Sequence, residues 1–466
     1  IGRIYMEQKE NKMGVMPVNK LLVSMSLPMM ISMLVQALYN IVDSIFVSRI
    51  DENALTAVSL AFPLQTLMIA LGTGTGVGIN ALLSKSLGEK DFDKADKTAE
   101  NGVFLALINY VVFCLIGFFL TKPFYLSQTR DPQIIEYGVQ YLRIVCCCSF
   151  GMYAQFVFER LLQSTGKTVY TMITQSLGAV INIVLDPIFI FGLHMGMRGA
   201  ALATIIGQIV SFCISLRYMF HFKTIRLTKE SFHMTGRHIE NIFKFGASAC
   251  FNQIAMTIVQ IVLNNTLSHY GAQSVYGGDI PLACAGIITK VNMIFMSFVI
   301  GISQGIQPII GFNYGAEKYE RVRKSYLLAL GTATVLSGIA FFCFQVFPRQ
   351  IISVFGSGSE LYFQFSERYF RIYMFLTLIN GIQPVTSNFF NSIGKSQLGV
   401  FMSLTRQILF LLPLIVIFPL FMGIDGVMYA GPIADAAAAI VCGYFMVREL
   451  KELSSMDRKK KEEYAA

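Results

Sequence analysis

Residues 86–95 read SLGEKDFDKA, and residues 313–322 read NYGAEKYERV. The glycines of these two stretches are 227 residues apart, and the same step relates further glycines: Gly74 to Gly301, Gly78 to Gly305 and Gly196 to Gly423. A stretch that recurs half a chain later predicts two homologous halves. In a hydrophobic chain such halves build two facing bundles, and function is expected in the space between them.

The composition predicts an integral membrane protein. Of the 466 residues, 54% are hydrophobic and only 14% are charged, which is more apolar surface than a soluble chain of this length could bury. Apolar segments long enough to cross a hydrocarbon core of roughly 30 Å recur along the chain. We predict an all-α membrane protein with about twelve transmembrane helices, over residues 18–48, 54–84, 98–121, 132–158, 168–192, 197–220, 241–269, 281–312, 325–347, 361–390, 396–420 and 425–448.

The basic residues predict the orientation of these spans. Lys and Arg concentrate in the breaks on the side of the N-terminus, whereas the opposite breaks hold only Arg49, Lys122, Arg130, Arg198 and Arg349. By the positive-inside rule, both termini of this multi-pass chain lie in the cytoplasm. Residues 222–238 are predicted to link an N-terminal lobe (1–221) to a C-terminal lobe (239–466). Six spans per lobe make the lobes parallel repeats.

Several classes of function are disfavoured by the sequence. The net charge of +9 follows from the topology and from attraction to the membrane surface, so it does not predict nucleic-acid binding. The nine cysteines form no CxxC pair and accompany no His cluster, so we expect neither a disulfide framework nor a metal site built on them. No HExxH motif and no Ser/His pair occurs within the spans, and we predict that the chain is not an enzyme.

Two acidic residues inside predicted spans indicate an ion site. Asp43 lies late in the first span and Asp186 late in the fifth, and Thr204 lies early in the returning sixth span. The three residues should therefore share one depth, in the outer half of the membrane. Tyr39 and Asn182 precede the two carboxylates by four residues, on the same helix faces. Two carboxyl groups in a bundle cannot comfortably both ionise, so one should hold a proton or a small hard cation should neutralise the pair.

Other charged or bending residues in the spans allow more than one interpretation. Glu159, at the inner end of the fourth span, pairs with Arg160, reaches water or adds a polar partner to the ion site. Pro28 and Pro187 each remove a backbone hydrogen bond and are candidate hinges. Six further residues either line a second cavity or pair with one another: Lys290, Glu367, Arg368, Arg371, Arg406 and Asp435.

At these residues the chain resembles the MATE family, the multidrug and toxic compound extrusion transporters, and in particular its DinF-like and MepA-like bacterial branch. The resemblance rests on the two six-span halves, on Asp43 in a proline-bent first span, on the repeated Gly-Lys pairs and on the stretch Asn182-x3-Asp186-Pro187-Ile188-Phe189-Ile190-Phe191-Gly192. It implies a V-shaped pair of bundles that exports organic cations or related amphiphiles in exchange for H+ or Na+ by alternating access. It also implies an H+ or Na+ coupling site made of Asp43, Asn182, Asp186 and Thr204, with Tyr39 nearby and Pro28 at the bend.

The expected setting is a monomer in the inner (cytoplasmic) membrane of a bacterium, in contact with lipids and without a cofactor. Soft and aromatic side chains suit a cavity for varied apolar cations, and the candidate substrate contacts are Gln36, Asn40, Gln260, Met293, Met296 and Tyr373. The seventh span offers glutamines where some family members have an acidic residue, so we expect ion coupling in the N-terminal lobe. The alternative is a flippase for a lipid-linked oligosaccharide or other lipid, which would need a cavity rich in Arg and Lys.

Overall fold

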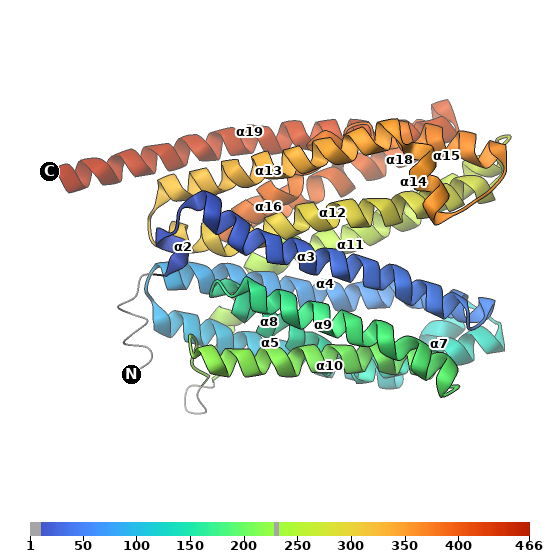
Figure 1. Ribbon diagram of the computed structural model, residues 1–466, viewed down its shortest axis with the longest axis horizontal. Helices are drawn as coiled ribbons and strands as arrows, with labels where there is room; N and C mark the ends of the chain where they lie inside the picture. Colours follow the sequence, from blue (N-terminus) through green and yellow to red (C-terminus); the bar gives the residue numbers. More distant parts are fainter. Residues whose placement is uncertain (1–10, 228–232) are drawn as a thin grey trace.

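The computed structural model describes residues 11–227 and 233–466, and this part of the chain is helical without a β-strand. Figure 1 shows two elongated bundles whose helices run roughly along a common axis. The first contains α2 (Lys12–Val15), α3 (Val18–Ser48), α4 (Glu52–Gly88), α5 (Phe92–Phe119), α6 (Thr121–Gln128), α7 (Pro132–Cys147), α8 (Phe150–Ser164), α9 (Thr168–Pro187), a π-helical segment (Ile188–Gly192) and α10 (Met197–Phe222).

The second bundle repeats this plan. It contains α11 (Gly236–Ala272), α12 (Asp279–Gly315), α13 (Tyr319–Val346), α14 (Pro348–Phe355), α15 (Glu360–Tyr373), a 3-10 turn (Thr377–Ile379), α16 (Ile382–Ser392), α17 (Ser396–Leu404), a π-helical segment (Thr405–Leu411), α18 (Leu412–Met422) and α19 (Ile424–Ala465). The middle of the predicted linker, residues 228–232, lies outside the described residues, as do residues 1–10. We call the end of the bundles that holds α2 and the last turns of α19 the α2 end, and the opposite end the far end (Figure 1).

Two of the predicted spans are broken. Ten helices of the described chain are long and apolar enough to cross a membrane, and the pair α7 and α8, bent by 43°, makes an eleventh span. The twelfth predicted span, 361–390, is divided into α15, the 3-10 turn and α16. Pro384 lies in the first turn of α16, where its missing N–H costs no helical hydrogen bond. A step of 227 residues carries the α7–α8 break onto the α15–α16 break, so the two halves share it.

The last span is longer than its apolar segment. The helix α19 covers 42 residues and includes the basic run Arg458 to Lys461, which the sequence would assign to a solvated tail. Lys460 forms an ion pair with Glu317 (3.0 Å), and Lys461 forms one with Glu320 (3.6 Å). The helix continues because no Gly or Pro stops it and because Lys, Arg and Glu are good helix formers.

The backbone of the two halves repeats in its turns as well. Lys90 and Glu317, 227 residues apart, are both non-glycine residues with a left-handed conformation, at φ 59° and 55°. Gly196 and Gly423, separated by the same step, also have positive φ. Left-handed φ values are uncommon for residues with a side chain. Their recurrence at one step therefore extends the duplication from sequence to geometry.

The two bundles are joined at and toward the α2 end. Asn80 of α4 donates a hydrogen bond to Gln307 of α12 (2.9 Å), and these two buried residues are themselves 227 positions apart. The contact of Gly88 with the Phe312 carbonyl and that of Gly315 with the Lys85 carbonyl form a reciprocal pair under the same step. A small apolar cluster of Met13, Leu21, Met25 and Ile309 also combines both bundles. The bundles therefore meet along an internal two-fold axis.

Glycines make the close contact between bundles possible, as their four-residue spacing predicts. A Cβ at Gly78 would lie 2.1 Å from the Ile242 carbonyl oxygen, and one at Gly246 would lie 1.9 Å from the Gly74 carbonyl oxygen. On the symmetry-related side, Gly301 and Gly305 of α12 contact the backbone of α3. Each bundle thus packs its second long helix against the first long helix of the other bundle.

Candidate functional site

The carboxylate pair is positioned by two helices that run in parallel register. Both α3 and α9 run from the α2 end toward the far end, and three side-chain contacts between them join residues that are each 143 apart: Met25 with Thr168, Ser32 with Gln175 and Tyr39 with Asn182. Asp43 and Asp186 are separated by the same number of residues. The register therefore brings them to one level, toward the far end of the first bundle.

A hydrogen-bond network surrounds Asp186, which is fully buried. With the Asn182 amide oriented toward this carboxylate, its nitrogen donates to both carboxylate oxygens, at 3.1 and 3.2 Å. The Asn182 oxygen then accepts from the Tyr39 hydroxyl (2.9 Å) and from the Thr204 hydroxyl (3.3 Å). The carboxyl groups of Asp43 and Asp186 lie within hydrogen-bonding distance of each other. The structure thus gathers Tyr39, Asp43, Asn182, Asp186 and Thr204 into one cluster.

The chemistry of this cluster suits a proton or one small cation. One carboxylate oxygen of Asp43 is buried and has no hydrogen-bond partner. Two carboxyl groups that share a hydrogen bond are satisfied when one of them holds a proton. Oxygen atoms of Asp43, Asp186, Asn182 and Thr204 are equally the kind of ligand that a hard cation prefers. Within the described chain, no group of three or more His, Cys, Asp or Glu side chains is arranged to hold a metal.

Two residues of this region were not predicted from the sequence. Tyr141 of α7 is buried close to Asp43, and its hydroxyl accepts a hydrogen bond from the Gln65 amide of α4 (3.0 Å). Both helices reach the site from the side opposite α9. A polar residue at a helical position gives no spacing signal by itself, so only the packing of α4 and α7 reveals these residues.

Glu159 belongs to a different cluster. Its buried carboxylate accepts hydrogen bonds from Gln155 (3.0 Å), Thr174 (3.1 Å) and Gln175 (2.7 Å), and Gln175 also contacts Ser32. Thr174 lies twelve residues before Asp186 on α9, which is about 18 Å along the helix. The structure therefore places Glu159 toward the α2 end and apart from the carboxylate pair.

The candidate hinges lie in two different settings. Pro28 is buried inside α3, which runs through it as one helix of 31 residues. Pro187 ends α9 and is followed by the π-helical segment. A proline removes one backbone N–H and crowds the preceding turn, which explains the wider turn at that point.

Most charges of the second bundle pair with one another. Arg406 forms an ion pair with the buried Asp435, and the Asn380 amide, turned toward the same carboxylate, donates to its two oxygens at 3.1 and 3.0 Å. Nearer the surface, Arg349 approaches Glu367 (3.5 Å) and Arg368 approaches Asp425 (3.0 Å). These contacts favour the pairing interpretation for Glu367, Arg368, Arg406 and Asp435.

The predicted substrate contacts are distributed over both bundles. Gln36 and Asn40 are exposed on α3, and Met293 is 37% exposed on α12. Met296 is half-buried, Gln260 donates to Asn264 (3.0 Å), and Tyr373 stacks on Tyr369 with ring centres 5.3 Å apart. No contact joins these residues into one site, so their common role stays a prediction.

Comparison with known proteins gives the family. The sequence profile described as MatE matches residues 28–188 and 248–417. A multidrug export protein MepA of Staphylococcus haemolyticus is 25% identical over 444 residues, which cover 94% of this chain and 95% of that protein. The MepA of Staphylococcus aureus is 24% identical over 432 residues, 91% of this chain and 92% of that protein.

The structural comparison agrees with the sequence. A solved structure described as the outward-facing conformation of a multidrug resistance MATE family transporter of the MOP superfamily superposes with a TM-score of 0.90 at 25% identity, over 96% of this chain and 99% of the other. This likeness confirms the predicted all-α, two-lobe fold of about twelve spans. The chain is therefore a multi-pass transporter, not an enzyme, and it belongs to the MATE family.

Proposed function

We propose that the chain is a secondary active exporter of organic cations and related amphiphiles, driven by the exchange of H+ or Na+. The observation that carries this proposal is the pair Asp43 and Asp186, held at one level by the α3–α9 register and joined through Asn182 to Tyr39 and Thr204. The names of the MepA relatives, which are multidrug export proteins, support the class of substrate.

The proposed mechanism couples ion binding to access from alternate sides. A proton or a Na+ ion binds between the two carboxyl groups, and its arrival changes how α3 packs on α9. Pro28 and Pro187 lie in or next to these helices and would absorb the change. Because α3 also packs on α12, a shift of α3 is transmitted to the second bundle. The ion and the drug thereby favour different conformations.

The proposed cellular setting follows from the charges. The basic breaks place the α2 end in the cytoplasm of a bacterium, so the far end, where the carboxylate pair lies, faces outward. We propose lobes of residues 1–221 and 239–466 that move relative to each other, in a monomer surrounded by inner-membrane lipids. A lipid-linked oligosaccharide flippase is less favoured, because Arg368 and Arg406 are already paired with Asp425 and Asp435.

The test is export of a fluorescent cationic dye from vesicles that contain the purified chain. An imposed pH gradient, with and without Na+, identifies the coupling ion. Asp43→Asn and Asp186→Asn should each remove gradient-driven export, because neither amide can exchange a proton or supply the negative charge that a cation needs. Asp425→Asn, which changes only a surface ion pair, is the matched control. Undiminished gradient-driven export by both site variants would refute the mechanism.

A further inference from the structure

Lys290 is a charged residue that neither the carboxylate site nor the pairs of the second bundle use. It is exposed on α12, and among the residues that the structure describes it has no salt bridge or hydrogen bond. A lysine within an apolar span is costly unless it reaches water, a partner or a ligand. Its surroundings therefore decide what it does.

The helical phase of α12 gives the direction in which Lys290 points. Gly301 lies eleven residues later on the same unbroken stretch of helix, and eleven residues make close to three turns at about 3.6 residues per turn. A Cβ at Gly301 would lie 2.5 Å from Met30 Cα, so this face of α12 is turned toward α3 of the other bundle. Ile288 and Phe295, both 5% exposed, form the opposite face and pack in the core of the second bundle. Lys290 thus faces the first bundle.

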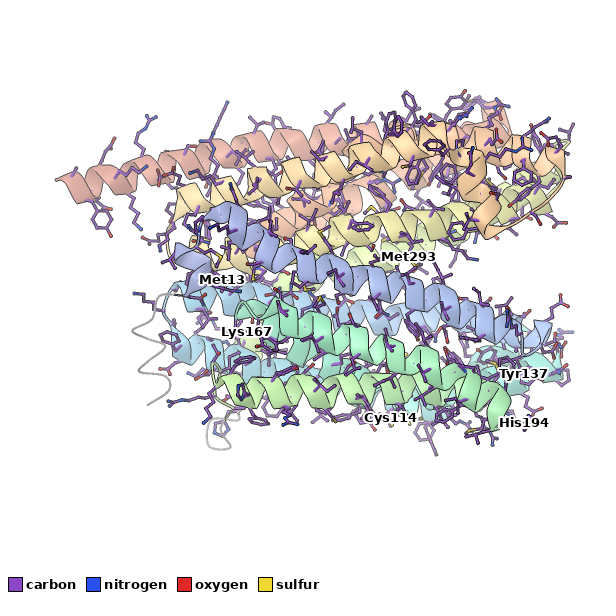
Figure 2. All side chains as sticks on the ribbon, viewed as in Figure 1. Met13, Cys114, Tyr137, Lys167, His194 and Met293 are labelled. Atoms are coloured by element: carbon purple, nitrogen blue, oxygen red, sulfur yellow. The ribbon has the colours of Figure 1, made fainter. Side chains whose placement is uncertain are left out.

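The two helices part between the contact and Lys290. Ser297, one turn from Gly301, is only 4% exposed, whereas Lys290, two turns further toward the far end, is exposed. Figure 1 shows α3 and α12 diverging toward the far end, and Figure 2 labels the exposed Met293 between them. Lys290 therefore lies where the bundles separate and on the side that faces the gap.

The level of Lys290 matches that of the carboxylate pair. From the contact between Met30 and Gly301, Lys290 lies about 16 Å toward the far end along α12, and Asp43 lies about 20 Å toward the far end along α3. The difference is within one helical turn. The first bundle thus presents carboxylates, and the second bundle presents an ammonium group, at one depth on either side of the gap.

We propose that Lys290 is a specificity-determining residue that binds an acidic group of the exported compound, so that the transporter accepts zwitterionic amphiphiles. The cationic part of such a compound is directed to the carboxylate side and its acidic part to the Lys290 ammonium. This arrangement stabilises both ends of the molecule where a purely cationic compound would meet a like charge. The inference rests on the export activity proposed above and adds the class of substrate.

The experiment compares two dyes that differ only at one group. Vesicles containing the full chain are loaded with a rhodamine ethyl ester, which is cationic, or with the corresponding free acid, which is zwitterionic, and export is driven by the coupling-ion gradient. Lys290→Met should lower export of the free acid roughly tenfold relative to the ester, as expected for the loss of one charge-assisted hydrogen bond. Lys290→Arg should retain export of the free acid. Lys244→Met, at an exposed ion pair with Glu240, is the control.

The outcomes separate the two proposals. Equal export of both dyes by Lys290→Met and the unmodified chain, or an equal loss of both, would overturn the role of Lys290 and leave the exporter intact. The same holds if the unmodified chain exports the ester and never the free acid. If neither dye is exported by the unmodified chain, the exporter proposal fails, and the role of Lys290 fails with it.

Discussion

Asp186 and Asp435 are buried carboxylates that the two bundles treat differently. Asp435 has a resident cation, the Arg406 guanidinium, together with the Asn380 amide. Asp186 has the Asn182 amide and a second carboxyl group but no basic side chain among its described contacts. One bundle therefore carries its counter-charge permanently, and the other leaves that position to a proton or to a cation from solution.

Removal of the resident cation should destabilise the second bundle. Arg406→Met leaves Asp435 buried and uncompensated, and we expect a loss of about 3–5 kcal/mol in the free energy of unfolding. The double variant Arg406→Met/Asp435→Asn removes both charges and should recover most of that loss. Thermal unfolding in detergent measures both. A double variant no more stable than the single one would contradict the pairing.

Much of the ion site could be predicted from single residues. The four-residue spacings of Tyr39 with Asp43 and of Asn182 with Asp186 place these side chains on common faces, and charge asymmetry gives the direction of each span. Glu159 shows the limit of this reasoning. Its depth depends on where α8 begins after the α7 break, and hydropathy does not detect that break, because the bend at Cys148 and Ser149 leaves the apolar segment continuous.

At the scale of helices, the fourth and tenth spans show the same limit. Both read as one apolar segment, yet each is two helices with a break at equivalent positions. Twelve apolar segments and short polar breaks were enough to predict the order of the spans, and α3 has the predicted bounds, Val18–Ser48. Breaks inside a span arise from tertiary packing, which a count of apolar residues does not contain.

The glycine contacts between α4 and α11 give a prediction at this scale. In Gly246→Ala the new methyl group would lie 1.9 Å from the Gly74 carbonyl oxygen, so the two helices must separate, at a cost of about 1–3 kcal/mol. Gly443→Ala in α19 is the matched control, because nothing lies within 4 Å of its Cβ position. That change should leave stability equal or slightly higher. Thermal unfolding of the two variants compares them, and equal melting temperatures would contradict the close approach.

At the scale of the whole molecule, the bundles are closed at the α2 end. Hydrogen bonds such as Arg160 to Gln304 (3.2 Å) and Gln163 to the Gln304 carbonyl (2.6 Å) reach from α8 to α12. Lys318 and Arg321 also hold the backbone of the α2 segment through Gly14 and Met13. Alternating access would require these bonds to break during each cycle.

A cross-link tests that requirement. Ser84 Cβ lies 3.4 Å from the Cβ position of Gly311, close to the roughly 3.5–4.5 Å that joins the Cβ atoms of a disulfide. Oxidation of the double variant Ser84→Cys/Gly311→Cys should abolish dye export, and a reductant should restore it. The cross-link is identified by mass analysis of the peptides, and the two single variants are the controls. Undiminished export by the cross-linked chain would show that the α2 end need not open.

The hydrogen bond between Asn80 and Gln307 has a consequence for the origin of the molecule. Equivalent residues of two copies touch each other only on a two-fold axis, and the reciprocal contacts around Gly88 and Gly315 are those of a self-complementary interface. Two separate six-span subunits could form the same contacts as a homodimer before any covalent connection existed. The duplication therefore fused an existing assembly, and the later divergence of the halves left an acidic ion site in one ancestral subunit and a permanently neutralised carboxylate in the other.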